Sequence, residues 1–163
     1  MNGNLPIPTH KLLVTYLKAG YRVCLPAGDD VLLHIGQPAP QLEVHRPAAR
    51  YTLITAFNPG SIPRPMEENL LADRALHARL ISLNIPIIAA LSHAPDGTWS
   101  EPGWLAAELE TAAADTLAMD FGQTGILHWH AGERVRLRMY RLPDTTTDTA
   151  QCVDWIRPYD VRC

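Results

Sequence analysis

The segment at residues 51–69, YTLITAFNPGSIPRPMEEN, constrains the fold more than any other part of this chain. Its first five residues are aromatic, apolar or β-branched and a proline-glycine pair follows, which predicts a buried strand that ends in a tight turn. Pro59 fixes its own φ and disfavours a helical conformation at the preceding residue, so we expect an extended Asn58. Gly60 tolerates positive φ, and Asn58-Pro59-Gly60-Ser61 therefore fits a type II turn.

A helix is expected directly after this turn, because Pro65 suits a first helical position and Glu67 and Glu68 complement the helix dipole. At about 100° per residue, two polar residues, Asn69 and Asp73, lie on the same stripe as the apolar residues Ala72, Leu76, Leu80 and Leu83. A buried polar group without a partner is costly. These two side chains therefore either fasten the preceding loop or line a pocket beneath the Asn58 turn, near a helix N-terminus that favours anions.

The rest of the chain alternates short helical and extended patterns. Helices are expected at residues 9–18, from residue 65 onward and at 111–121, and strands at 21–25, 31–35, 51–55, 85–91, 104–109, 126–130 and 134–141. Residues 42–45 read as a short extended piece and residues 99–102 as a loop. This mixed order predicts an α+β fold with a mixed, mainly antiparallel sheet of about six or seven strands, packed against about three helices on one face.

The length of 163 residues suits one compact domain. We assign residues 1–142 to a single α+β domain, and residues 143–163 to a polar linker and a C-terminal extension that packs back on it, through Trp155, Ile156, Tyr159 and Val161.

The composition points to a cytoplasmic protein. The first residues resemble no signal peptide, and no apolar run approaches the ~20 residues that span a bilayer. The three cysteines, Cys24, Cys152 and Cys163, are widely spaced and odd in number, which favours reduced thiols, with Cys24 in the core and Cys163 exposed. A net charge of −3 provides no overall attraction to nucleic acid or to anionic membranes.

Four separate motifs occur in the order TAFNPGS, EEN, DGTWSEPG and FGQTGILHW. Together they resemble the bacterial family called domain of unknown function 3293, over about residues 21–138. The family pattern, as it maps onto this chain, marks Thr55, Asn58, Ser61, Asn69, Trp99, Glu101, Phe121 and Gln123. Asp73 stands where the family usually has a second asparagine, and Gly125 where it usually has alanine. The resemblance implies no established activity.

The residues that coincide with these motifs are mostly amides and hydroxyls. Glu101 follows Trp99, and a carboxyl group beside an indole can have a raised pKa and act as a general acid or base; alternatively it accepts backbone hydrogen bonds in a loop. Gln123 either reaches toward the Asn58 turn or bonds the sheet backbone. Because Glu101 is the single proton-transfer candidate, the set favours binding over catalysis, and whether the protein is an enzyme stays open.

Our first hypothesis is a domain that binds a small polar or nucleotide-like molecule without a cofactor. Its candidate catalytic residue is Glu101, and its candidate binding residues are Thr55, Asn58, Ser61, Asn69, Asp73, Trp99 and Gln123.

The last predicted hairpin suggests an alternative. A loop at residues 131–133 places five basic side chains on one face, with the core on the other. These five are His128, His130, Arg134, Arg136 and Arg138. They form a solvated face or a contact surface for a protein or nucleic acid, as in regulatory or immunity-type proteins, and like charges here call for a counter-charge. The His-x-His pair lacks a third ligand, so no metal site is expected.

Overall fold

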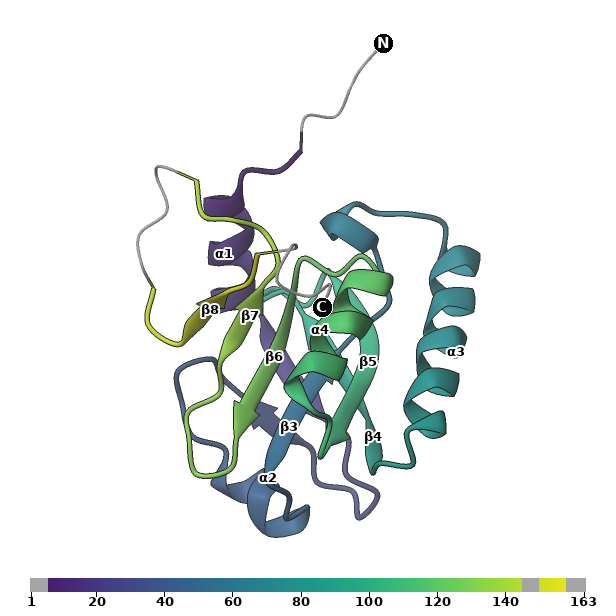
Figure 1. The fold of residues 1–163 in the computed structure, drawn as a ribbon, viewed down its shortest axis with the longest axis vertical. Coiled ribbons are helices and arrows are strands. Elements are labelled where there is room, and N and C mark those ends of the chain that lie inside the picture. The colour runs from purple at the N-terminus through teal and green to yellow at the C-terminus, as the bar shows by residue number, and fades with distance from the viewer. Residues whose placement is uncertain (1–5, 145–149, 158–163) are drawn as a thin grey trace.

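The computed structural model describes residues 6–144 and 150–157. Within these residues the chain forms four α-helices and one mixed sheet of eight strands in the order β2-β1-β4-β5-β3-β6-β7-β8 (Figure 1). The strands are β1 (Gly20–Val23), β2 (Val31–Leu33), β3 (Arg50–Ile54), β4 (Ile87–His93), β5 (Ser100–Ala107), β6 (Gly125–His130), β7 (Leu137–Met139) and β8 (Val153–Trp155). All neighbours in the sheet are antiparallel except β7 and β8, so the predicted α+β class is confirmed, with slightly more strands than expected.

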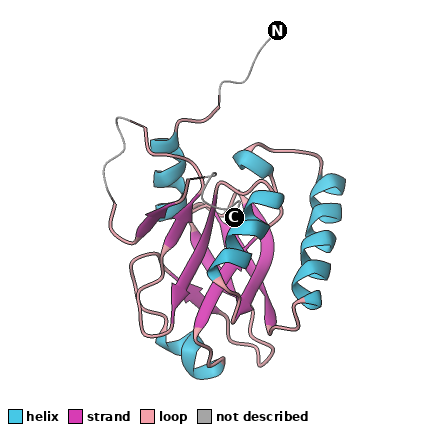
Figure 2. Ribbon diagram, viewed as in Figure 1, coloured by secondary structure: helices cyan, strands magenta, loops and turns pink. Residues whose placement is uncertain are grey.

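Helices cover both faces of the sheet, not one face as expected (Figure 2). Helices α1 (Thr9–Lys18) and α2 (Pro40–His45) pack on one face, and α3 (Met66–Ser82) and α4 (Thr111–Asp120) on the other. The reason is visible in β3, where Leu53 belongs to the first core and Ile54 to the second. A strand that is apolar on both sides needs a cover on each.

Two local predictions were wrong. Residues 42–45, read as extended, lie in α2, which begins with Pro40 at a first-turn position where a missing N–H costs nothing. Residues 99–102, read as a loop, belong largely to β5, because the hairpin with β4 continues through Leu91 opposite Pro102 to His93 opposite Ser100. This extension of the strand fixes the direction of Glu101.

The C-terminal part of the chain returns to the sheet. Strand β8 lies parallel to β7, with Leu137 opposite Val153 and Met139 opposite Trp155. Residues 145–149 of the expected linker, and Tyr159, Val161 and Cys163, lie outside the described residues. Cys24, expected in the core, is half-buried because side chains alternate along this segment and the buried positions are Tyr21 and Val23. None of the helices in the described part of the chain is long and apolar enough to cross a bilayer.

Candidate functional site

The chain leaves β3 through Thr55, whose hydroxyl donates to the Pro102 carbonyl at 2.7 Å and accepts the Phe57 N–H at 3.1 Å. Gly60 then takes positive φ, as predicted, and the turn at residues 58–61 is closed by a 2.9 Å hydrogen bond from the Ser61 N–H to the Asn58 carbonyl. The expectation of an extended Asn58 was wrong, since this residue is left-handed, with φ 47° and ψ 64°. Asparagine tolerates this region better than most residues.

Asn58 is held in this conformation by Asn69 at the head of α3. Its N–H donates to Asn69 Oδ1 at 2.9 Å, and Asn69 Nδ2 donates back to Asn58 Oδ1, also at 2.9 Å. Arg64 completes the group, with its Nε 2.6 Å from Asn69 Oδ1 and a terminal nitrogen 2.9 Å from the Ala56 carbonyl. Asn69 is buried as the helical stripe predicts, and its side chain fastens the loop.

Asp73, the other polar residue on that stripe, is half-buried. Its carboxylate accepts the indole N–H of Trp104 at 3.0 Å, and the ring of Trp104 lies 4.3 Å from that of His77. None of Asn58, Asn69 and Asp73 lines the cavity described next.

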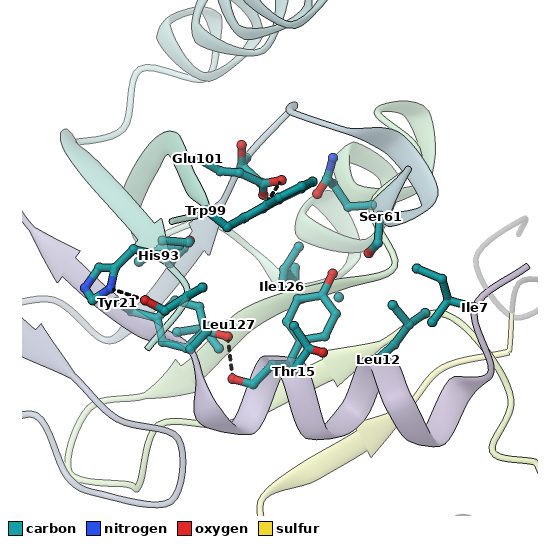
Figure 3. Close-up of a pocket in the computed structure, with 18 residues that line it drawn as sticks. Ile7, Leu12, Thr15, Tyr21, Ser61, His93, Trp99, Glu101, Ile126 and Leu127 are labelled. Atoms are coloured by element: carbon teal, nitrogen blue, oxygen red, sulfur yellow. Dashed lines mark hydrogen bonds between the residues drawn. The ribbon is translucent and has the colours of Figure 1, made fainter. Parts of the chain in front are cut away.

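A cavity of about 330 Å³ lies between α1 and the sheet (Figure 3). Its walls come from α1, β1, β3, β4, β5 and β6, on the face that also carries the first core. Five of the residues predicted from the sequence line it: Thr55, Ser61, Trp99, Glu101 and Gln123. The sequence therefore identified one end of the cavity.

Glu101 stands at this polar end, and one of its carboxylate oxygens is fully engaged. Oε1 accepts Asn58 Nδ2 at 2.8 Å and the Trp99 indole N–H at 2.9 Å. Burial raises the pKa of Glu101, and these two hydrogen bonds oppose the increase. Within residues 6–144 and 150–157, no protein group bonds Oε2. This carboxyl group thus has a fixed orientation and one oxygen available to a ligand.

Gln123 is buried beside the same end of the cavity. Its Nε2 donates to the Phe57 carbonyl at 3.1 Å and to the Phe121 carbonyl at 3.3 Å, so it does reach across to the chain beside the Asn58 turn. The amide nitrogen is committed to the backbone.

Sequence reasoning missed the other wall of the cavity, which includes Leu12, Thr15 and Tyr16 of α1. Burial raises the pKa of Tyr16 to about 12, and a hydrogen-bonding Ser61 hydroxyl opposes the shift. The amphipathic pattern of α1 predicts a buried face but not the surface on which it packs. Gly125 makes room for this helix, since a Cβ there would lie 3.2 Å from Tyr16 Cζ and 3.0 Å from Met139 Sδ.

His93 was also missed, at the end of β4 where the sequence predicted the strand to have finished. Its Nδ1 lies 3.0 Å from the Ala94 carbonyl, which only accepts, so Nδ1 carries the proton and a neutral ring has Nε2 as an acceptor. Gly20 lies beneath the ring, where any larger residue would overlap it.

The hairpin of β6 and β7 has the predicted register, with Leu127 opposite Leu137 and the His128 N–H bonded to the Arg136 carbonyl. Its basic face is largely neutralised within the chain. Arg136 binds both oxygens of Asp154 at 2.9 Å, and Arg138 binds those of Asp115 at 2.7 and 2.9 Å. The expected counter-charges thus come from β8 and α4.

His128 is buried and neutral, between the hydroxyls of Thr52 at 2.8 Å and Thr111 at 2.9 Å. Burial lowers its pKa to about 4, with the positive charge of Arg138 as the next cause. His130 and Arg134 are exposed, so these two alone of the five basic side chains reach solvent freely. In the described residues no three histidine, cysteine or carboxylate side chains cluster as a metal site would require.

Residues 54–126 match the family model described as "Protein of unknown function (DUF3293)". The matched range includes Thr55, Asn58, Asn69, Glu101 and Gln123, so the resemblance in the sequence motifs is confirmed there. No curated protein and no solved structure matched the chain.

Proposed function

Because the DUF3293 model that residues 54–126 match is described without an activity, we propose a function from the geometry: the protein binds a small molecule in the cavity between α1 and the sheet. The observation that carries this proposal is the cavity itself, mostly apolar and with convergent polar groups at one end. Its volume of about 330 Å³ lies in the range of roughly 300–1,000 Å³ that is usual for small-molecule sites.

The lining argues for a different ligand from the nucleotide-like one first considered. Phosphate groups are usually held by arginine, lysine or helix N-termini. No lysine or arginine is among the cavity's described lining residues. The guanidinium of Arg64 is instead bonded to Asn69 and to the backbone. A ligand with a sizeable apolar part suits these walls better.

Binding is proposed rather than a reaction. Glu101 is the cavity residue best suited to proton transfer, because its pKa is raised and Oε2 faces no protein partner among the described residues. A substrate would have to place its reacting atom at this oxygen.

We further propose that the protein is bacterial and cytoplasmic, as the sequence indicates.

The basic hairpin face supports the alternative hypothesis less well. Arg136 and Arg138 are both committed to carboxylates of the same chain, and His128 is buried. A partner would find only His130 and Arg134 available on this face.

Thermal unfolding with a panel of metabolites tests the binding proposal. We expect one or more compounds to raise the Tm of the wild type, because a ligand that binds only the folded state stabilises it. Ser92→Phe should abolish the shift, since Ser92 lines the cavity and no described residue bonds its side chain. Ser82→Phe is the matched control, since Ser82 is exposed at the end of α3, on the other face of the sheet, and does not line the cavity.

The variant Asn69→Ala tests whether the polar residues near the Asn58 turn only hold the loop in place. We expect it to lower the Tm by removing two accepted and one donated hydrogen bond. If it does so while no compound shifts the wild type, the polar residues are structural and the proposal is wrong.

A further inference from the structure

We infer that the ligand is a primary amine with an apolar body, whose ammonium group binds Oε2 of Glu101 while the body lies against α1. This inference rests on the proposed function and names the chemical class of its ligand.

The charge of the cavity is the first argument. Among its described lining residues Glu101 is the single carboxylate, and no lysine or arginine accompanies it. Arg64 is hydrogen-bonded to Asn58 and Asn69 but does not line the cavity, and its guanidinium is held by the neutral oxygens of Asn69 and Ala56. An anionic ligand would meet an unbalanced carboxylate here, whereas a cation would neutralise it.

The hydrogen-bonding groups give the second argument. The side-chain N–H groups of Asn58 and Trp99 both donate to Oε1 of Glu101, which leaves Oε2 as an acceptor. Gln123 commits its Nε2 to two carbonyls, and no described residue donates to its Oε1. The Ser92 hydroxyl, opposite Glu101 across the β4–β5 pair, can accept as well as donate. Oε2 of Glu101, Oε1 of Gln123 and this hydroxyl can therefore all accept from a ligand group that only donates, and an ammonium carries three donors and no acceptor.

Aromatic and apolar surfaces supply the rest of the site. Figure 3 shows Trp99 beside Glu101, with Ile126, Leu127 and Leu12 further along the cavity toward α1. Trp99 remains 41% exposed although it lines the cavity, so its ring is accessible at the opening. An indole face attracts a cation. The burial that raises the pKa of Glu101 also makes an unpaired carboxylate costly, and an ammonium group would offset that cost.

Calorimetric titration with matched probes tests the inference. One series is 2-phenylethylamine, 2-phenylethanol and phenylacetate, and the other is hexylamine, hexanol and hexanoate, so that body and charge vary separately. We expect the wild type to bind each amine about tenfold or more tightly than its alcohol, as a hydrogen bond to a charged group would give. The carboxylates should bind most weakly.

Glu101→Gln should remove the preference for the amines while the alcohols still bind, because glutamine keeps an oxygen for Asn58 and Trp99 but has no charge. Retained alcohol binding also shows that this variant is folded around an intact cavity. Glu68→Gln is the matched control, since Glu68 is exposed on α3 and does not line the cavity.

Amines that bind no more tightly than their alcohols, or a preference that survives Glu101→Gln, would overturn the inference but leave the binding proposal standing. Failure of both amines to bind overturns it as well. If, in addition, no compound of the larger panel shifts the Tm, the proposed function fails with it.

Discussion

At the scale of single residues, the conformations of Asn58 and Asn69 are held by hydrogen bonds that join distant parts of the chain. Asn69 was recognised because an amide on an apolar helical stripe needs a partner, and it is indeed buried and paired. The left-handed Asn58 was missed because bonds to Asn69 and Glu101, far away in the chain, outweigh the local preference of a residue before proline. Local rules carry no information about such distant partners.

His128 gives a pH dependence that belongs to one residue. The pKa of its imidazole is about 4 in the folded protein, against 6.5 ordinarily. Between these values the unfolded chain binds a proton that the folded chain does not, so stability falls as pH is lowered through this window. The loss should reach about 3 kcal/mol near pH 4 and then level off.

Urea denaturation at several pH values measures this effect. Glu101 acts in the opposite sense, because its raised pKa favours the folded state at low pH. The difference between wild type and His128→Gln isolates the imidazole. A difference in stability that stays constant from pH 7 to pH 4 would contradict the prediction.

At the scale of elements, apolar repeats in the sequence predicted individual helices and one hairpin well, but contacts between distant elements could not be predicted from them. The helix at residues 9–18 and the register of β6 with β7 follow from apolar periodicity and a short loop. The extension of β5 across Pro102 does not, because it depends on β4 as a partner on one side. The position of α1 over β3 and β6 was equally hidden, and with it one wall of the cavity.

The docking of α1 should depend on its buried apolar face. Leu12 is buried in the first core and also lines the cavity, so Leu12→Ala should lower the free energy of unfolding by about 2–4 kcal/mol. Val14, exposed on the same helix, provides the control, and Val14→Ala should change it by less than about 0.5 kcal/mol. Urea denaturation measures both, and equal effects would show that α1 is not held by this face.

At the scale of the whole molecule, the fold class was predictable and the layering was not. Alternating helix and strand patterns indicated α+β, but the number of covered faces depends on strands that are apolar on both sides. In β3 and just after it, Thr52 and Thr55 hide the apolar character of both sides, because both are buried with their hydroxyls hydrogen-bonded. A threonine reads as polar in a sequence pattern even where its hydroxyl is satisfied inside.

The two cores share the central strands, so we expect them to unfold together. Far-ultraviolet circular dichroism reports the helices of both faces, and fluorescence reports the four tryptophans, among them Trp129 of the first core and Trp104 beside the second. Their urea transitions should coincide if the two cores unfold as one cooperative unit. Two separated midpoints would show that the faces are independent.

The side-chain amide of Asn58 connects Glu101, which lines the cavity, to Asn69, which does not. Asn58 bonds Glu101 through Nδ2, while its Oδ1 is held by Asn69 on α3 and by the Arg64 N–H. Any occupant that pulls on the carboxylate therefore also changes the energy of the turn and of the first residues of α3. By thermodynamic reciprocity, if the occupant changes the binding of a second molecule to that end of α3, the second molecule must change the affinity of the cavity for its occupant by the same factor.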